Sequence, residues 1–218
     1  MLRLPGPFRG LRIGLFGGSF NPAHDGHAHV AETARQRLGL DWVWWLPARG
    51  NPLKDAQENF ASRHASAARL VERHPRMRIS DLEVQLGTNY TLDTLCQLLP
   101  RLPEARPVWI MGADSLAHFH HWGGWQDIAL RIPIAIVARP GVGLQARRSV
   151  FAQTFADFRL PESEARRLAD TAPPAWVYLS APWNHASSTA LRARARLRNP
   201  FRTDRSAAEL REPGTQGS

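Results

Sequence analysis

The sequence predicts an α/β fold, doubly wound around a mainly parallel sheet, and two observations carry this prediction. Six short runs rich in β-branched and aromatic residues recur along the chain, and most are continuously apolar rather than alternating. Continuous apolar runs are typical of strands that are buried on both faces. Segments with helical periodicity lie between the runs, and strands that alternate with helices indicate a parallel sheet.

The expected elements follow from these patterns one by one. The six strand-like runs are residues 11–16, 42–46, 77–80, 108–111, 132–138 and 176–180. The clearest helix spans residues 26–38, because Val30, Ala34 and Leu38 share one face and Gly39 then stops it. The other expected helices are residues 60–73, 91–99, 115–121, 161–171 and 188–198.

Length and composition favour one domain. The chain has 218 residues, of which 43% are hydrophobic and 22% charged, which suits one buried core and excludes global disorder. We expect a single domain over residues 1–200 and a flexible tail over residues 201–218, where apolar periodicity is lost. Most of the eight tryptophans are expected in the core, among them Trp42, Trp44, Trp45 and Trp109.

Membrane insertion and secretion are not expected. The longest apolar runs, such as residues 132–138, are far shorter than the roughly 20 residues of a membrane span, and Pro and Gly interrupt the start of the chain before any signal-peptide core. Cys96 is the only cysteine, so no intramolecular disulfide can form, and we expect a reducing, cytoplasmic location. Its place within an expected helix predicts a buried side chain.

The charge balance suits an anionic partner. The formal net charge is +9, and surplus cations attract nucleotides, phosphates or nucleic acids. Lys54 is the only lysine among the 28 cations, and such an arginine bias is also what a GC-rich genome produces. The charge therefore does not identify the partner by itself. We recognise no nucleic-acid-binding module and expect no nucleic-acid partner, although a basic nucleic-acid-binding protein remains the alternative from another class.

Residues 17–27, GGSFNPAHDGH, follow the first expected strand and form the strongest candidate site. Ligands of open α/β sheets bind at the carboxyl ends of the strands, where two glycines let the backbone approach a ligand and a helix N-terminus binds phosphate. His24 and His27 are three residues apart, so one helical turn places both beside that ligand. The alternatives are a simple glycine turn, ordinary surface histidines, or a metal bound by His24, His27 and His29, although zinc requires further ligands.

The same segment resembles the HxGH motif of the nucleotidylyltransferase superfamily, and four further segments extend the resemblance in the family's order. They are GNPLK at residues 50–54, NYTLDT at 89–94, MGADSLAHFHHWGGW at 111–125 and ASSTALR at 186–192. Together they are similar to the motifs of bacterial nicotinate mononucleotide adenylyltransferases. The resemblance implies a Rossmann-like nucleotidylyltransferase fold. It also implies transfer of the adenylyl group of ATP to nicotinate mononucleotide, giving nicotinate adenine dinucleotide and pyrophosphate in NAD biosynthesis.

The resemblance also implies roles for individual residues. Catalytic roles at the phosphates fall to His24, His27, Lys54 and Arg192. ATP binding falls to Gly17, Gly18, Ser19, Phe20, Gly112, Asp114, Ser188 and Thr189. Acceptor binding falls to Tyr90, Thr91, Trp122 and Gly123. Asp114 would accept the ribose hydroxyls, and its alternative role is to cap the helix expected at residues 115–121.

The expected partners are ATP and nicotinate mononucleotide, while the formation of a homo-oligomer stays open. Mg²⁺ is expected on the ATP phosphates and no dedicated protein metal site is expected, including at the cluster of His118, His120 and His121. Asn21 stands where many bacterial members of the family carry Asp. This difference leaves nicotinamide mononucleotide, or another phosphorylated acceptor, as the alternative within the fold.

Overall fold

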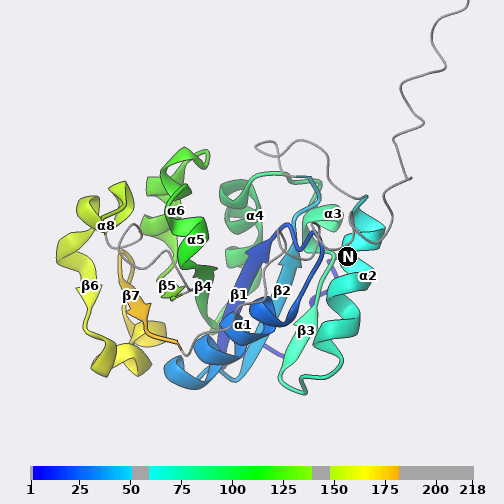
Figure 1. The fold of residues 1–218 in the computed structure, drawn as a ribbon, viewed down its shortest axis with the longest axis horizontal. Coiled ribbons are helices and arrows are strands. Elements are labelled where there is room, and N and C mark those ends of the chain that lie inside the picture. Colours follow the sequence, from blue (N-terminus) through cyan, green and yellow to red (C-terminus); the bar gives the residue numbers. More distant parts are fainter. Residues whose placement is uncertain (1, 51–58, 139–147, 182–218) are drawn as a thin grey trace, which may run out of the picture.

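A seven-stranded sheet forms the centre of the computed structural model, which describes residues 2–50, 59–138 and 148–181 (Figure 1). The strands are β1 (Arg12–Gly18), β2 (Trp42–Pro47), β3 (Met77–Ile79), β4 (Arg106–Gly112), β5 (Ile134–Val137), β6 (Arg159–Leu160) and β7 (Trp176–Leu179). Their order is β3-β2-β1-β4-β5-β7-β6, and every neighbouring pair is parallel. The predicted fold class and its parallel sheet are confirmed.

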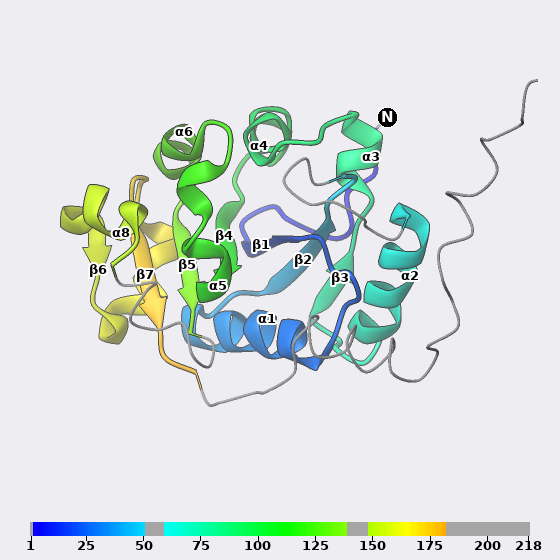
Figure 2. The same ribbon diagram turned by 45° about the horizontal axis from the view of Figure 1, so that its top comes forward.

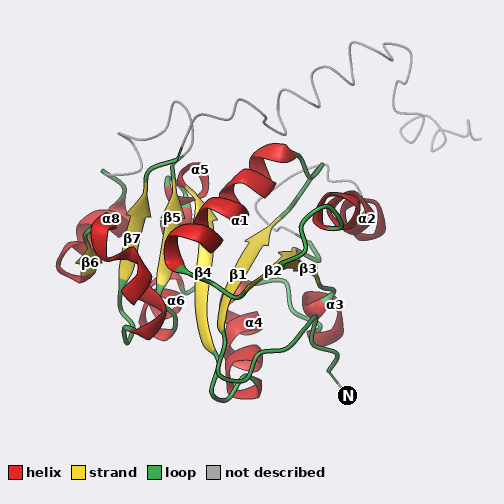
Figure 3. Cartoon of the chain, turned by 90° about the horizontal axis from the view of Figure 1, so that it is seen from below, coloured by secondary structure: helices red, strands yellow, loops and turns green. Residues whose placement is uncertain are grey.

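Helices cover both faces of the sheet. One face carries α1 (Asp25–Leu38), α2 (Phe60–Val71) and the 3-10 helix η4 (Glu162–Asp170). The opposite face carries α3 (Leu82–Leu86), α4 (Thr91–Leu98), α5 (Ala113–Leu116), α6 (Trp125–Arg131) and α8 (Val150–Thr154). Figure 2 shows α3, α4 and α6 above the strands and α1 beneath them, and Figure 3 shows the same two layers from below. Among the described residues, three short 3-10 helices lie between these elements: η1 (Leu99–Arg101), η2 (Phe119–His121) and η3 (Ala156–Phe158).

The two layers explain why the strand sequences are continuously apolar. In β2, Trp44 and Leu46 belong to the core on the α4 side, whereas Val43 and Trp45 belong to the core on the α1 side. The same alternation runs along the other central strands, because successive side chains of a strand point to opposite faces of the sheet. Both faces must then be apolar, as the sequence predicts.

The first helix shows how local sequence sets its bounds. α1 begins after His24, whose backbone is extended and whose side chain accepts a hydrogen bond from the Gly26 amide. It ends at Gly39, whose φ of 66° is left-handed and whose N–H donates to the Arg35 carbonyl. Glycine adopts this conformation without a Cβ penalty. The predicted helix at residues 26–38 is therefore confirmed, together with its stop at Gly39.

Two expected helices have a different form. Residues 115–121 do not make one helix, since α5 ends at Leu116 and η2 begins at Phe119, after His118 leaves the helical conformation. The break lets Phe119 bury completely against Phe151, with ring centroids 5.4 Å apart. Residues 161–171 form the 3-10 helix η4 instead of an α-helix. Its buried Ala165 and Leu168 are three residues apart, the spacing that one face of a 3-10 helix presents.

Several expectations about single residues meet a mixed outcome. Trp44, Trp45 and Trp109 are buried as expected, but Trp42 is only partly buried, with the Arg78 guanidinium 4.3 Å from its ring centre. The expectation that Cys96 is buried is wrong: it lies exposed on α4, since Leu95 and Leu98 already form the apolar face of that helix. Over the described residues, none of the helices is both long and apolar enough to span a bilayer.

Candidate active site

The candidate site lies where the order of the strands reverses. From β1 the chain proceeds to β2 and β3 on one side, and β4 then pairs with β1 on the other side. In doubly wound sheets this switch point opens a crevice at the carboxyl ends of the two central strands. The predicted nucleotide-binding residues lie at the carboxyl ends of these two strands and directly after them: Gly17, Gly18, Ser19 and Phe20 at β1, and Gly112 and Asp114 at β4 and the start of α5. The fold therefore brings these two segments together.

Gly17 and Gly18 are required by packing within the protein. A Cβ on Gly17 would lie 2.3 Å from the Trp109 ring, and a Cβ on Gly18 would lie 3.0 Å from the Phe20 ring. The sequence pattern attributed these glycines to close approach of a ligand. The structure adds a second reason, because aromatic rings pack directly over the backbone on each side of the loop.

Phe20 is held in an uncommon conformation by its surroundings. Its φ of 45° is left-handed, which is unfavourable for a residue with a bulky side chain. The ring is completely buried, stacked 4.9 Å from Trp45 and edge-on to His27 at 5.0 Å. Since the side chain serves the core, any contact of this residue with a nucleotide has to come from its backbone.

His24 and His27 form a reciprocal cap at the start of α1. The His24 Nδ1 accepts from the Gly26 amide at 3.1 Å, and the His27 Nδ1 accepts from the His24 amide at 3.3 Å. Their ring centroids are 3.8 Å apart. A neutral imidazole that accepts at Nδ1 carries its proton on Nε2. Both rings are thereby set to donate from Nε2 at a helix N-terminus, where an anion is favoured.

A hollow opens between the start of α1 and α2, beside His24. Its volume is ≈ 340 Å³, and it is lined by Ala23, His24, Asp25, Ser66, Arg69, Leu70 and Arg73. Arg73 lies 3.6 Å from Asp25 across the opening. Arg69, Arg73 and the helix N-terminus give this surface positive charge, which the Asp25 carboxylate partly offsets.

The two segments predicted to bind the acceptor meet at one place. Tyr90 and Thr91 lie at the start of α4, and Tyr90 is 49% exposed. A Cβ on Gly123 would lie 3.7 Å from the Tyr90 ring, so the two residues are neighbours. Trp122 is partly buried, with its ring 5.2 Å from that of Phe119. These predicted acceptor residues therefore line one surface, built from the N-terminus of α4 and the turn before α6.

Asp114 does not cap a helix. The N-cap position of α5 is occupied by Gly112, and Asp114 lies exposed in the first turn. The alternative in which Asp114 caps a helix at residues 115–121 is therefore wrong. Its carboxylate stands beyond the carboxyl end of β4, at the switch point.

Two buried charged residues near the site escaped the sequence analysis. Arg63 on α2 is 1% exposed and Glu83 on α3 is 6% exposed. Burial raises the pKa of Glu83 to about 7, against the lowering effects of the Arg49 amide and the Arg63 charge. One signal for Arg63 was present in the sequence: it precedes Ala67, Leu70 and Val71 on the buried stripe of α2, where a charged residue is unusual.

Four predicted site residues lie outside the described part of the chain: Lys54, Ser188, Thr189 and Arg192. The helix expected at residues 188–198 and the tail expected at residues 201–218 lie outside it as well. Among the residues that are described, there is no group of three or more His, Cys, Asp or Glu side chains arranged to hold a metal ion.

The fold and its switch-point loops define an α/β protein of the nucleotide-binding type. Residues 15–194 match the model of the cytidylyltransferase-like family, and the chain belongs to this family. Among curated relatives, the probable nicotinate-nucleotide adenylyltransferase of Caulobacter sp. strain K31 is 55% identical over 186 residues, covering 84% of this chain and 98% of that protein. The protein of the same description from Bradyrhizobium sp. strain BTAi1 is 51% identical over 183 residues, covering 84% of this chain and 95% of that protein.

Solved structures share the fold at lower sequence identity. Plasmodium falciparum nicotinic acid mononucleotide adenylyltransferase complexed with NaAD superposes with a TM-score of 0.62 at 17% identity, covering 84% of this chain and 83% of the other. The same enzyme complexed with APC gives a TM-score of 0.61 at 18% identity, with the same coverage. At these identities the likeness concerns the fold.

Proposed function

We propose that this protein transfers the adenylyl group of ATP to nicotinate mononucleotide, with release of nicotinate adenine dinucleotide and pyrophosphate. The observation that carries the proposal is the His24–His27 pair, whose Nδ1 atoms close the cap of α1 at the switch point of the sheet. Membership of the cytidylyltransferase-like family and the 55% identical relative support it.

The proposed chemistry asks the protein for alignment and charge neutralisation. The acceptor phosphate is ionised near neutral pH and attacks the α-phosphorus of ATP, while negative charge builds on the leaving pyrophosphate. Such a reaction depends on positioning and on preorganised donors more than on a strong base. His24 and His27 would supply these donors, and Lys54, Ser188, Thr189 and Arg192 would act at the phosphates. Mg²⁺ would arrive on the ATP phosphates as part of the substrate.

The acid form of the acceptor is the proposed substrate. Nicotinate differs from nicotinamide by one negative charge, so selection requires donors without a neighbouring carboxylate. The start of α4 offers the Tyr90 and Thr91 hydroxyls and its N-terminal amides, and the adjoining turn offers the Gly123 amide beside Trp122. No carboxylate occurs at residues 90–92 or 122–125. The helix N-terminus favours the anion further.

The proposal is tested by pyrophosphate release from ATP with nicotinate mononucleotide, nicotinamide mononucleotide and phosphopantetheine as acceptors. The expected result is a preference for the acid mononucleotide of about tenfold or more in kcat/KM, equal to about 1.4 kcal/mol. Equal or faster use of nicotinamide mononucleotide would overturn the choice of the acid. No release with any acceptor, together with salt-dependent DNA binding, would favour the nucleic-acid-binding alternative.

A further inference from the structure

Arg63 is a cation buried within the layer between α2 and the sheet. Arg63 is 1% exposed. Moving a guanidinium out of water is strongly unfavourable unless its N–H groups find acceptors and its charge is compensated. An alanine or leucine would satisfy the apolar stripe of α2 without this penalty. The arginine therefore calls for a role that an apolar side chain cannot perform.

The guanidinium of Arg63 joins two loops at the carboxyl edge of the sheet. Nη1 donates to the Ser19 carbonyl at 2.7 Å, in the loop that follows β1. Nη2 donates to the Ala48 carbonyl at 2.7 Å and to the Arg49 carbonyl at 3.1 Å, in the loop that follows β2. The planar guanidinium of arginine can donate to both loops from two separate nitrogens, whereas lysine has a single ammonium nitrogen.

The peptide that joins Ala48 to Arg49 is held from both sides. Arg63 donates to its carbonyl oxygen, and the Glu83 Oε2 accepts from its N–H at 2.8 Å. The C=O and N–H of a trans peptide point in opposite directions. The cation and the carboxylate thus lie on opposite sides of one peptide unit and are both aligned with its dipole. The Ala48 amide also donates to the Gly18 carbonyl at 2.9 Å, which fastens the two loops to each other.

The same geometry orients the loop after β1. Because Arg63 holds the Ser19 carbonyl, the N–H of Phe20 in that peptide points away from the guanidinium. A loop that receives phosphate must turn its carbonyl oxygens inward and its amides toward the anion. Arg63 donates to the inward Ser19 carbonyl, so the orientation of this peptide is fixed before a ligand binds.

We infer that Arg63 is a positioning residue, which with Glu83 as its counter-charge fixes residues 17–20 and 48–49 in the arrangement that aligns the reacting phosphates. This inference rests on the proposed adenylyl transfer. It predicts that replacing the Arg63 guanidinium lowers kcat even when the protein stays folded, because a small misplacement of aligned reactants lowers the reaction rate strongly.

The test compares Arg63→Lys with Leu168→Ala in pyrophosphate release from Mg·ATP and nicotinate mononucleotide. Leu168 is completely buried on η4, away from the two loops. Its truncation therefore lowers the stability of the protein without altering these loops, and serves as the control for a general loss of stability. All variants are assayed at pH 8 and well below their melting temperatures. We expect Arg63→Lys to lower kcat at least tenfold, whereas Leu168→Ala lowers the melting temperature and leaves kcat and KM unchanged.

A folded Arg63→Lys protein with the kcat and KM of the wild type would overturn the inference, because the arginine would then be structural only. If Arg63→Lys does not fold, Glu83→Gln decides the question, since it keeps an acceptor for the Arg49 amide and removes the counter-charge. A fall in its kcat of threefold or more supports positioning, and unchanged kinetics overturn it. A wild-type protein inactive with all acceptors would instead refute the proposed function itself.

Discussion

At the scale of single residues, each histidine of the α1 cap has a structural role in the cap and a proposed role in the reaction. Each Nδ1 closes the cap, and each Nε2 is the atom that we propose donates to the substrate phosphates. The two roles of His27 can be separated, because asparagine places an acceptor near the Nδ1 position and glutamine places a donor near the Nε2 position. We expect His27→Asn to lower kcat about a hundredfold or more, the size of one lost transition-state donor, with a melting temperature near that of the wild type.

His27→Gln provides the matched comparison. It keeps an N–H near the position of Nε2 and loses the acceptor of the cap, so it should retain more activity than His27→Asn while losing about 1 kcal/mol of stability. Steady-state kinetics and thermal unfolding of both variants check this pattern. The reverse order of activities would show that the cap, and not the Nε2 donor, is what the reaction needs.

The histidine pair was predictable because its two members are close in the sequence. Arg63 was not predictable, because its partners are far from it in the sequence. His24 and His27 stand three residues apart at a strand-to-helix junction, so sequence alone places them together. The partners of Arg63 are the carbonyls of Ser19, Ala48 and Arg49, and backbone carbonyls leave no trace in side-chain identity. Only a charge on an apolar stripe could have marked it.

At the scale of elements, Glu83 makes the seating of α3 against the loop after β2 sensitive to pH. Burial raises its pKa from 4.5 to about 7, so the folded protein binds this proton more tightly than the unfolded chain. Stability contributed by the protonated form is present at low pH and is lost as the pH rises from 4.5 towards 7. We expect Glu83→Gln to remove this dependence.

Urea unfolding of the wild type and of Glu83→Gln at several pH values between 5 and 8 measures the effect. The stability of the variant relative to the wild type should rise with pH, by on the order of 3 kcal/mol at most. Taking the difference cancels the titration of other groups. A difference that stays constant across this range would mean that the carboxyl titrates as it does in the unfolded chain.

The turn before α6 fits against α4 through a glycine with a left-handed backbone. Gly124 has a φ of 67°, and a Cβ there would lie 2.3 Å from the Leu92 side chain. We expect Gly124→Ala to cost about 1–3 kcal/mol through backbone strain and overpacking. It should also raise KM for the acceptor more than KM for ATP, because Leu92 neighbours the proposed acceptor residues.

Gly123→Ala is the control for this turn. Its Cβ would meet Tyr90 at an ordinary 3.7 Å, so stability should change little. Thermal unfolding distinguishes the two variants, and KM values for both substrates are measured for Gly124→Ala. Equal effects on the two KM values in Gly124→Ala would separate this turn from the acceptor side of the site.

Elements with a strong apolar period were predictable, and short elements set by tertiary contacts were not. Six of the seven strands and the helices α1, α2 and α4 follow their sequence patterns, whereas the two-residue strand β6 was not predicted. Helices α3, α6 and α8 have five to seven residues, too few for a periodicity to develop. The break after α5 depends on Phe119 reaching Phe151 across the fold, which no local pattern contains.

At the scale of the whole molecule, the sequence predicts parallel pairing but not the order of the strands. Continuous apolar runs separated by helices imply a parallel sheet, whereas the pairing of β1 with β4 joins segments far apart in the chain. The motif resemblance implied a Rossmann-like nucleotidylyltransferase fold, and the order of the strands comes from the structure. Once β1 and β4 are neighbours, the loops that follow them must share one edge of the sheet.

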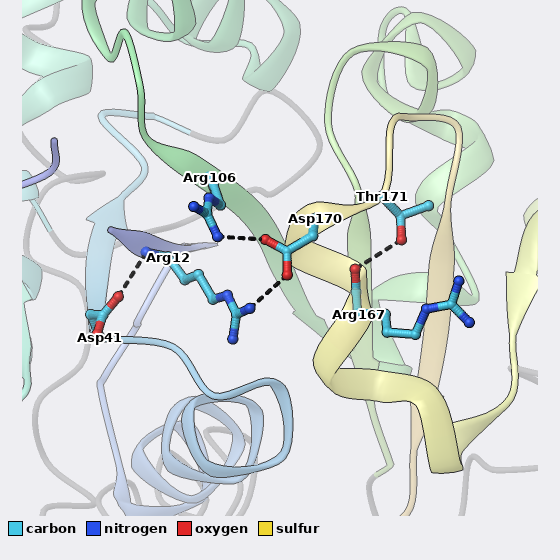
Figure 4. A network of polar contacts seen from close by, with 6 residues as sticks. All are labelled: Arg12, Asp41, Arg106, Arg167, Asp170 and Thr171. Atoms are coloured by element: carbon cyan, nitrogen blue, oxygen red, sulfur yellow. Dashed lines mark hydrogen bonds and ion pairs between the residues drawn. The ribbon is translucent and has the colours of Figure 1, made fainter. Parts of the chain in front are cut away.

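The opposite, amino edge of the sheet is tied by one carboxylate. Asp170 at the end of η4 accepts from Arg12 at the start of β1 at 2.6 Å and from Arg106 at the start of β4 at 2.8 Å (Figure 4). The Arg12 amide also donates to Asp41 at 2.8 Å. This cluster joins the two central strands to η4 at the end of the sheet away from the candidate site, so it should support stability and leave catalysis unchanged.

Asp170→Asn tests this division between the two edges. Burial raises the pKa of Asp170, but the hydrogen bonds from Arg106 and Arg12 outweigh it, so the pKa lies below its usual 3.8. The ionised carboxylate thus contributes stability above that value, and the contribution is lost as the pH falls through the lower pKa of the folded protein. Because the side chain is partly exposed, we expect Asp170→Asn to lose about 1 kcal/mol of stability at pH 7. This loss should shrink in 1 M salt and in acid, and kcat should stay unchanged.

Asp157→Asn is the control, since Asp157 is an exposed acid without a salt bridge among the described residues. It should alter neither the stability nor kcat. A fall in kcat for folded Asp170→Asn would mean that the amino edge is coupled to the site across the length of β1 and β4.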